Sequence, residues 1–405
     1  MKQLLLTAFG LLLLLSSASA QIDTTAGRYL RPVFPQVSVV RDVEYGAAVN
    51  SAGTNQILRL DLYQPQGDTV RRRPLVVLAH EGAFLTGNRN DQFMTELCTR
   101  LAQLGYVAVS IDYRVGFFPF DSVNVGRAAL RAAQDMRAAV RFFRRDAATA
   151  RQYRIHPGYI FAGGSSAGAF VALQLGYLDK PAEVPAYVGL AAVGGTLEGQ
   201  SGNPGYSSAV AAVLNLSGAV GALSWLEPGN VPLLSVHGTA DTVVPFLLGK
   251  AFGLSTSPRL YGSGALKPRA DAVGIPNGLK ALAGAGHVPY NGSSPGSVAY
   301  FDTTFRAVRD FLRPLLRRPG TVLTQQAPTF WQHVQLYPLP ARAAVYLDAG
   351  PGFRPSQLTL TDATGRVVRR LFWPQPRLVI ERGALPAGIY YLSGPGLPAR
   401  RLALE

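Results

Sequence analysis

Cysteine and histidine are scarce in this sequence, and their scarcity excludes several kinds of site. The single cysteine, Cys98, rules out an internal disulfide. In TELCTRLAQL it shares a helical face with leucines, so we expect a buried apolar side chain rather than a nucleophile. The five histidines form no H-E-x-x-H motif and are too scattered for a zinc hydrolase. We therefore expect no metal and no organic cofactor.

Negative charge is also low, with 24 acidic against 39 basic residues and a formal net charge of +15. Such an excess can mark a surface for nucleic acid or another anionic partner. No basic motif interleaved with aromatics is present, however, and we expect no nucleic-acid partner. Arginines fall mostly between apolar positions at helical spacing from Val125 to Phe143, which predicts a solvated helix face carrying Arg127, Arg131, Arg137, Arg141 and Arg144.

The apolar run from Leu4 to Leu15 is too short to span a membrane, which takes roughly 20 residues. Lys2 precedes this run and SSASA follows it. That order predicts a signal peptide over residues 1–20, with cleavage after Ala20. We therefore expect a mature protein that leaves the cytoplasm and has no transmembrane span.

Apolar runs and amphipathic segments alternate between Pro74 and Tyr177. This alternation indicates βαβ units, and hence an α/β fold whose mostly parallel sheet carries helices on both faces. We expect an antiparallel hairpin, DVEYG and ILRLDLYQP, ahead of these units in a domain over residues 21–316. The expected strands are PLVVLAH, YVAVSIDYR, YIFAGG, AVLNLSGAV, VPLLSVHG and LKALAGAG, and the expected helices cover residues 91–104, 125–146, 167–178 and 297–316.

The pattern changes after Pro314. Residues 317–329 have the composition of a linker. Beyond them, AAVYLDA, SQLTLTDATGRVVRRLFW, RLVIER and GIYYLSG are strand-like and are broken by Gly and Pro turns, which predicts a small all-β sandwich over residues 330–405. The Gly-rich residues 179–208 are a candidate for a cap or insertion near the site.

GSSAG, residues 164–168, lies between a predicted strand and a predicted helix. A G-x-S-x-G sequence in that setting forms a nucleophile elbow, a turn so tight that bulky side chains two residues before or after the serine would clash. The central Ser166 is therefore the candidate nucleophile, and Ser165 is a small neighbour. The backbone N–H of Ala167, at the start of the helix, is a candidate donor to a developing oxyanion.

His287 is the candidate base that a serine nucleophile needs. In AGAGHVPY it follows a predicted strand and precedes the last helix, so its loop can place the imidazole over Ser166. The remaining histidines occupy less suitable positions in the sequence: His80, His156, His237 and His333.

Asp241 is the candidate carboxylate that orients His287 and stabilises its imidazolium form. In HGTADTVVP it lies on a short turn after a buried strand. Asp271 is the competitor, but LKPRADAVG predicts a loop with no strand behind it. The chain order serine, aspartate, histidine is that of the α/β hydrolases.

HEGAF, residues 80–84, comes at the end of the predicted strand PLVVLAH. The backbone N–H groups of Gly82 and Ala83, together with that of Ala167, are candidates to form the oxyanion hole.

LAHEGAFLTGNR resembles the HGGG-F motif of the carboxylesterase and hormone-sensitive-lipase-like α/β hydrolases. IDYR, RAAQDMRAAVRFFRR, YRIHPGYIFAGGSSAGA and HGTADTVVP resemble the segments that follow it in those enzymes, so the resemblance covers roughly residues 42–316. It implies the α/β-hydrolase fold and a serine esterase with Ser166, Asp241 and His287 as its triad. Glu81 stands where the family usually has glycine, and its carboxylate either contacts substrate or points to solvent.

LTLTDATGRVVRRLFW, LPAGIYYL and the basic close ARRLALE resemble the C-terminal sorting domain of type IX secretion in Bacteroidetes. The resemblance implies a β-sandwich that the type IX secretion machinery recognises and that is often removed on export. The protein would then be secreted or held at the cell surface. An ordinary accessory β-domain, for example one that binds carbohydrate, is the alternative.

These features together predict an exported serine carboxylic-ester hydrolase that forms an acyl-enzyme on a small-molecule or polysaccharide-linked ester. The same triad cleaves amides in prolyl-oligopeptidase-like peptidases, although no propeller domain precedes the predicted catalytic part. A catalytically inactive hydrolase fold used for binding is the alternative of a different class. The sequence does not specify the acyl and alcohol parts of the substrate.

Overall fold

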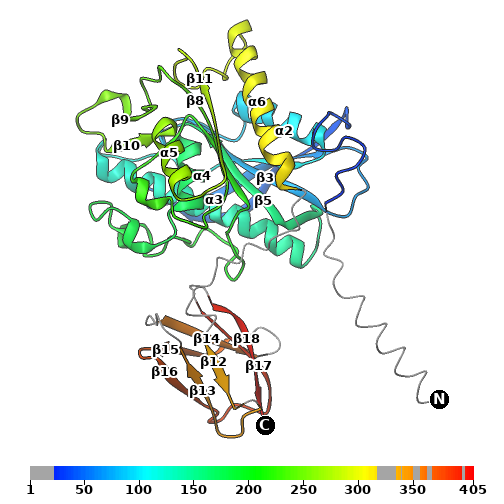
Figure 1. Ribbon diagram of the computed structural model, residues 1–405, viewed down its shortest axis with the longest axis vertical. Coiled ribbons are helices and arrows are strands. Elements are labelled where there is room, and N and C mark those ends of the chain that lie inside the picture. The colour runs from blue at the N-terminus through cyan, green and yellow to red at the C-terminus, as the bar shows by residue number, and fades with distance from the viewer. Residues whose placement is uncertain (1–21, 317–333, 339, 350–355, 363–366, 395–396) are drawn as a thin grey trace, which may run out of the picture. The chain divides into compact units, whose positions relative to one another are not determined.

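The computed structural model describes residues 22–316, 334–338, 340–349, 356–362, 367–394 and 397–405. The chain divides into two compact units, residues 1–321 and 322–405 (Figure 1). The predicted signal peptide and the predicted linker over residues 317–329 lie outside the described residues. Within the part of the chain that is described, no helix is long and apolar enough to cross a membrane.

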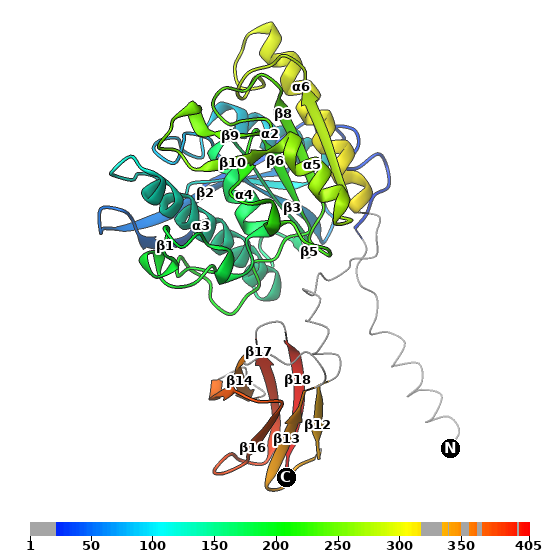
Figure 2. The same ribbon diagram turned by 60° about the vertical axis from the view of Figure 1, so that its left-hand side comes forward.

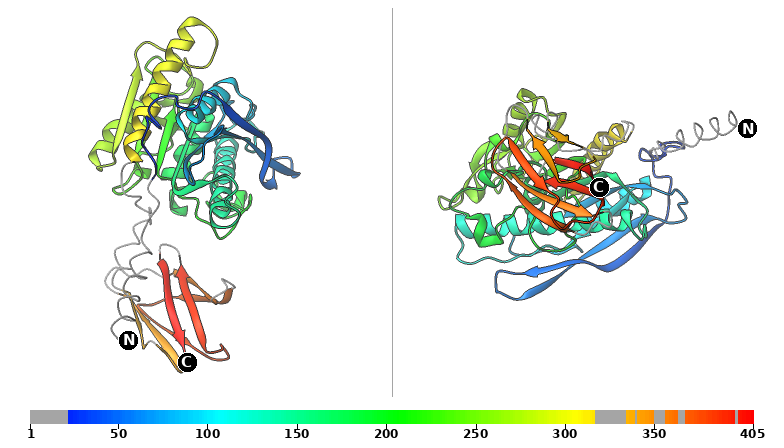
Figure 3. Two further views of the ribbon diagram at one scale, coloured as in Figure 1. Left: turned by 90° about the vertical axis from the view of Figure 1, so that its right-hand side faces the viewer. Right: turned by 90° about the horizontal axis from the view of Figure 1, so that it is seen from below.

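An eight-stranded sheet forms the centre of the first unit (Figure 1). In spatial order its strands are β1 (Val37–Val49), β2 (Asn55–Pro65), β4 (Val107–Ile111), β3 (Arg73–Ala79), β5 (Ile155–Ser165), β6 (Ala212–Leu216), β8 (Leu233–Gly238) and β11 (Asn277–Leu282). The pairs β1–β2 and β2–β4 are antiparallel, and the other pairs are parallel. The β1–β2 hairpin forms one edge of the sheet (Figure 3). The predicted hairpin and mostly parallel sheet are thus confirmed.

Helices cover both faces of this sheet, as the sequence predicts. Along β3, Leu75 and Val77 pack into one core while Val76 and Leu78 pack into another, because successive strand residues point to opposite faces. The second core includes side chains of α2 (Gln92–Leu104) and α6 (Pro295–Leu315). The first includes side chains of α3 (Ser122–Ala148), α4 (Ala167–Tyr177) and α5 (Ser263–Ala272) (Figure 2).

The helix α5 is an element that the sequence analysis does not predict. The prediction of a loop with no strand behind it is wrong, because α5 directly follows a short strand over residues 259–262. The helix forms although Pro268, which lacks the N–H that a helix interior needs, lies inside it. Asp271 therefore lies on a helix, where its carboxylate accepts from Lys267 Nζ at 2.6 Å. The remaining short elements of this unit are β7 (Ala219–Val220), β10 (Arg259–Gly262) and β9 (Leu248–Lys250), which form a three-stranded sheet, and the 3₁₀ turns η1 (Pro181–Glu183), η2 (Leu190–Val193), η3 (Leu223–Trp225) and η4 (Ala251–Gly253).

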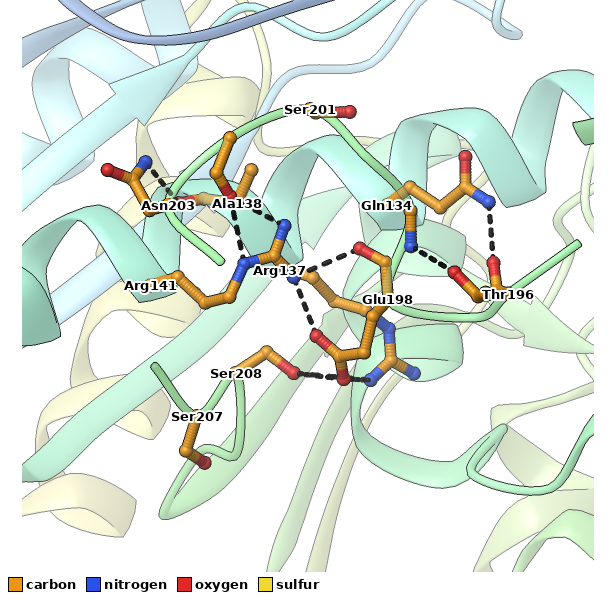
Figure 4. A network of polar contacts seen from close by, with 12 residues as sticks. Gln134, Arg137, Ala138, Arg141, Thr196, Glu198, Ser201, Asn203, Ser207 and Ser208 are labelled. Atoms are coloured by element: carbon orange, nitrogen blue, oxygen red, sulfur yellow. Dashed lines mark hydrogen bonds and ion pairs between the residues drawn. The ribbon is translucent and has the colours of Figure 1, made fainter. Parts of the chain in front are cut away.

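The predicted solvated face of α3 is wrong. Arg137 and Arg141 are only 7% and 4% exposed. Both donate to the carboxylate of Glu198, with Nη1 to Oε1 at 3.3 Å from Arg137 and Nη1 to Oε2 at 2.6 Å from Arg141 (Figure 4). Their other N–H groups donate to backbone carbonyls, for example Arg141 Nε to Gly202 at 3.0 Å. Paired in this way, the guanidinium groups are buried without losing their hydrogen bonds.

The Gly-rich stretch after α4 is what buries these arginines. It packs along α3, and its contacts follow the helix in order (Figure 4). Arg127 donates to the carbonyl of Val188 at 2.9 Å and Gln134 to that of Thr196 at 2.8 Å. Arg144 donates to the carbonyl of Ala209 at 2.6 Å. The stretch predicted as a cap or insertion near the site therefore covers a helix.

The second unit consists of two small antiparallel sheets, as the sequence predicts. One contains β12 (Gln335–Tyr337), β13 (Ala344–Asp348) and β16 (Arg377–Glu381). The other has the order β15 (Val367–Trp373), β14 (Ser356–Asp362), β17 (Gly388–Gly394) and β18 (Leu397–Leu404). Both sheets contribute to one apolar core, which contains Val345, Leu347, Leu360, Trp373, Ile380 and Leu392.

Candidate active site

Ser166 lies on a strained turn between β5 and α4. Its backbone has φ 50° and ψ −116°, a conformation that a non-glycine residue adopts only where the surrounding structure imposes it. A Cβ on Gly164 would lie 2.3 Å from the carbonyl carbon of Gly168, and a Cβ on Gly168 would lie 2.0 Å from the carbonyl oxygen of Ala79. Both glycines are therefore required, and the turn has the geometry of a nucleophile elbow.

The structure brings the three predicted triad residues into one hydrogen-bonded line. Ser166 Oγ lies 2.8 Å from His287 Nε2, and His287 Nδ1 lies 2.7 Å from Asp241 Oδ2. Because an ionised carboxylate only accepts, Nδ1 carries the proton, and Nε2 of the neutral imidazole accepts from the serine hydroxyl. The three residues follow β5, β8 and β11, whose carboxyl ends lie at one edge of the parallel sheet.

Backbone hydrogen bonds hold the loop of His287 against the turn of Asp241. The N–H of Thr239 donates to the carbonyl of Leu282 at 3.0 Å, and the N–H of Ala240 donates to that of Ala285 at 2.9 Å. Main-chain contacts therefore hold the loop that carries the imidazole next to the turn that carries the carboxylate.

A second histidine, which the sequence analysis sets aside, also binds Asp241. His237 Nε2 lies 3.0 Å from Asp241 Oδ2 and 3.1 Å from the carbonyl oxygen of Val244. Since a carbonyl only accepts, Nε2 carries the proton, and Nδ1 accepts from the hydroxyl of Ser263 at 2.8 Å. His237 is fully buried. The local signal was the pair of residues His and Asp four apart in HGTAD, at the end of a buried strand.

The pKa of Asp241 lies well below its ordinary value. Burial raises this pKa, but the hydrogen bonds from His237 and His287 and from the N–H of Val244 lower it more. Asp241 is therefore ionised at neutral pH, and it can stabilise an imidazolium ion on His287.

The loop after β3 presents unpaired backbone donors. Gly82, Ala83 and Phe84 have successive positive φ angles of 120°, 54° and 62°, which concentrates strain at this turn. Within the described part of the chain, the N–H groups of Gly82, Ala83 and Ala167 have no hydrogen-bond acceptor in the protein. These three N–H groups therefore remain candidates for an oxyanion hole.

The sequence analysis expects the carboxylate of Glu81 either to contact substrate or to point to solvent. In the structure it accepts hydrogen bonds from two side chains of the protein. Oε1 accepts from Asn291 Nδ2 at 2.7 Å and Oε2 accepts from Ser165 Oγ at 2.9 Å. Burial raises the pKa of Glu81, and the hydrogen bonds from Asn291 and Ser165 offset this only in part. The Ser165 hydroxyl also lies 3.0 Å from the hydroxyl of Tyr290, which donates to Ser217 Oγ at 3.1 Å. Glu81 thus links the loops of the candidate oxyanion hole, the nucleophile and His287.

The other residues singled out in the sequence lie away from this line. The ring of His80 stacks on that of Tyr113, with centroids 4.2 Å apart, and His156 lies in β5, while His333 is outside the described residues. Cys98 is a buried free thiol, as predicted, and burial raises its pKa. Among the residues that the structure describes, no group of three or more His, Cys, Asp or Glu side chains could hold a metal ion.

The strand order and the strand–turn–helix setting of Ser166 define the first unit as an α/β-hydrolase fold. The BD-FAE family matches residues 60–229. This range contains Ser166 and the candidate oxyanion donors and ends before Asp241 and His287.

Solved structures of esterase 2 from Thermogutta terrifontis share this fold. The form phosphoramylated by tabun is 21% identical and covers 70% of this chain and 96% of its own, with a TM-score of 0.50. The form phosphorylated by paraoxon is 22% identical and covers 70% and 95%, also with a TM-score of 0.50. The apo form is 21% identical and covers 70% and 96%, with the same TM-score. No curated protein sequence matches the chain.

Proposed function

We propose that the first unit is a serine carboxylic-ester hydrolase that works through an acyl-enzyme. The observation that carries this proposal is the line of hydrogen bonds from Ser166 through His287 to Asp241. The strained turn at Ser166 and the unpaired N–H groups beside it also support the proposal. So does the shared fold with an esterase that paraoxon phosphorylates.

In the first half of the reaction, Ser166 Oγ attacks the acyl carbon of the ester while its proton passes to His287 Nε2. The electron pair of the carbonyl moves onto its oxygen, which accepts hydrogen bonds from the N–H groups of Gly82, Ala83 and Ala167. Asp241 stabilises the imidazolium ion that forms. The bond to the alcohol oxygen then breaks, and His287 returns the proton to that oxygen as the alcohol leaves.

In the second half, a water molecule takes the place of the alcohol. His287 accepts a proton from this water, and the resulting oxygen nucleophile attacks the acyl carbon of the ester on Ser166. The bond to Ser166 Oγ breaks, and His287 protonates that oxygen. The products are a carboxylic acid and the original enzyme.

Paraoxon labelling tests this proposal. One equivalent of 4-nitrophenol should be released as Ser166 gains a diethylphosphoryl group, which mass spectrometry locates. Ser165→Ala should be labelled in the same way and Ser166→Ala should not. A chain that is not labelled and hydrolyses no ester would support the inactive binding protein instead. Faster cleavage of a matched amide than of the ester would support a peptidase.

We also propose that residues 1–20 direct export and that residues 330–405 are recognised by the type IX secretion machinery. The motifs D-x-x-G-R and L-P-A-G-I-Y support this, as does the separate antiparallel β unit. In a Bacteroidetes host, the full chain should reach the medium or the cell surface, whereas a chain that ends at Arg318 should accumulate in the periplasm. A truncated chain that still reaches the medium would contradict the proposal.

A further inference from the structure

Two loops of the first unit expose large apolar side chains. The aromatic loop, residues 115–120, joins β4 to α3, and Phe118 in it is 80% exposed. The leucine loop, residues 245–254, follows the turn of Asp241, and Leu247 in it is 60% exposed. We call five exposed side chains of these loops the apolar rim: Phe118, Phe120, Leu247, Phe252 and Leu254.

Both loops are attached to parts of the candidate active site. In the aromatic loop, the N–H of Gly116 donates to the carbonyl of Phe84 at 2.6 Å, next to the candidate oxyanion donors. In the leucine loop, the N–H of Phe252 donates to the carbonyl of Val243 at 2.8 Å. Val243 in turn donates its N–H to Asp241 Oδ1 at 2.8 Å. Backbone hydrogen bonds therefore hold each loop beside the reacting groups.

Phe170 connects the two loops beside the nucleophile. It lies one turn along α4 from Ser166, and its N–H donates to the carbonyl of that residue at 3.2 Å. Its ring lies 6.3 Å from that of Phe84. Phe170 also packs against the buried cluster of Ala219, Val244 and Leu260, against which Ala251 of the leucine loop packs as well. Apolar side chains therefore lie next to Ser166 on the side of Phe84, whose carbonyl binds the aromatic loop, and on the side of the cluster against which the leucine loop packs.

The chemistry of the rim favours a neutral apolar ligand. Neighbouring exposed apolar side chains mark a binding surface on a soluble protein, and each of the two loops carries at least two of them. The aromatic loop has the sequence VGFFPF and the leucine loop PFLLGKAFGL, so neither contains a carboxylate. The one cation, Lys250, donates to the carbonyl of Ser255. The loops therefore present no fixed ionic partner for a charged or sugar-like group.

We propose that the apolar rim binds the hydrocarbon chain of the substrate, and that the preferred substrates are esters of long-chain fatty acids. This inference rests on the proposed ester hydrolysis. With the acyl carbon at Ser166, the acyl chain runs past Phe170 and reaches the rim. Each methylene that becomes fully buried in this way raises kcat/KM about fourfold.

The test compares 4-nitrophenyl decanoate with 4-nitrophenyl acetate, which share a leaving group, on the full chain at concentrations where the esters are monomeric. The decanoate should be preferred in kcat/KM by roughly tenfold or more. Phe118→Ala combined with Phe120→Ala, and separately Leu247→Ala combined with Phe252→Ala, should each lower kcat/KM for the decanoate about five times more than for the acetate. Leu30→Ala is the matched control, because this exposed leucine lies beside the carboxyl end of α2, and both rates should stay unchanged.

The outcomes separate this inference from the proposed function. If neither ester is hydrolysed and paraoxon does not label Ser166, the proposed function itself fails. The chain-binding role is overturned if the acetate is hydrolysed but the decanoate is not preferred. It is also overturned if the rim variants leave the ratio of kcat/KM for the decanoate to kcat/KM for the acetate unchanged. Sedimentation velocity can reveal a dimer that the rim variants dissociate. If the kcat/KM ratio of the two esters is unchanged in those variants, a second copy of the chain covers the rim instead of the substrate.

Discussion

Replacing Glu81 should loosen two loops of the candidate site at once. Its carboxylate accepts from Asn291 Nδ2 at 2.7 Å and from Ser165 Oγ at 2.9 Å. A hydrogen bond to a charged group contributes about 1.5–3 kcal/mol to stability. Because Glu81 is partly exposed, its two hydrogen bonds should each contribute an amount near the lower end of this range. Glu81→Ala should therefore lower the free energy of unfolding in urea by about 2–3 kcal/mol. It should also lower kcat for ester hydrolysis about 10- to 100-fold, because the donors and His287 lose a common anchor.

A double-mutant cycle isolates the link between the loops. Asn291→Ala removes one of the two hydrogen bonds, so the Glu81–Asn291 coupling energy should be about 1–2 kcal/mol. Glu81→Gln is the matched control, because its amide oxygen still accepts from Asn291 and its length is unchanged. A coupling energy within about 0.3 kcal/mol of zero would refute the link, whatever the single variants do.

The pH dependence of stability reports the burial of the Glu81 carboxyl group. Burial raises the pKa of Glu81 above its ordinary value of 4.5, so the folded chain holds this proton more tightly than the unfolded chain does. The stability that the proton contributes is fully present below that ordinary value and is lost as the pH rises through the folded-state pKa. Relative to Glu81→Gln, the wild type should therefore lose free energy of unfolding as the pH rises above this ordinary value of 4.5.

Three further expectations concern single side chains. Ser166→Ala should lower kcat by about 10⁴- to 10⁶-fold, whereas Ser165→Ala should keep substantial activity; near-native turnover in purified Ser166→Ala would exclude the mechanism. Because the pKa of Asp241 is depressed below its ordinary value of 3.8, the stability it contributes should be present above that value and lost as the pH falls; the difference in unfolding free energy from Asp241→Asn should shrink on acidification. Glu198→Ala should lower the free energy of unfolding by about 1–3 kcal/mol, because Arg137 and Arg141 lose their shared carboxylate, while Glu198→Gln should lower it less.

The fold and the three candidate triad residues could be predicted from the sequence because each depends on local signals. The continuous apolar run of β3, whose residues are all buried, and the helical spacing along α2 and α3 are each visible within a single segment. Ser166, Asp241 and His287 each follow a strand that the sequence marks clearly, and the carboxyl ends of parallel strands meet at one edge. Knowing the sheet is therefore enough to expect the three residues together.

The contacts that support the candidate triad could not be predicted from the sequence, because they join residues far apart in the chain. Asn291 lies 210 positions beyond Glu81, and no spacing rule connects two loops at that separation. His237 was dismissed because it ends a strand, although that position points its ring at the following turn. The helix α5 was not predicted either, and it forms around Pro268 because Leu266 and Ala270 pack in the core.

The arginines of α3 show why composition alone does not tell which charged side chains are exposed. Their spacing is that of an amphipathic helix, and without a partner such a face belongs in water. The Gly-rich stretch supplies the carboxylate of Glu198 to both arginines and the carbonyl of Gly202 to Arg141. The end of α4 supplies the carbonyl of Leu178 to Arg137. Arg114 is buried in the same way, 2.8 Å from the carboxylate of Asp135. Guanidinium groups in such positions contribute to the net charge of +15 but connect the insertion and the loops to the helix, so the charge total is a poor guide to an anionic partner.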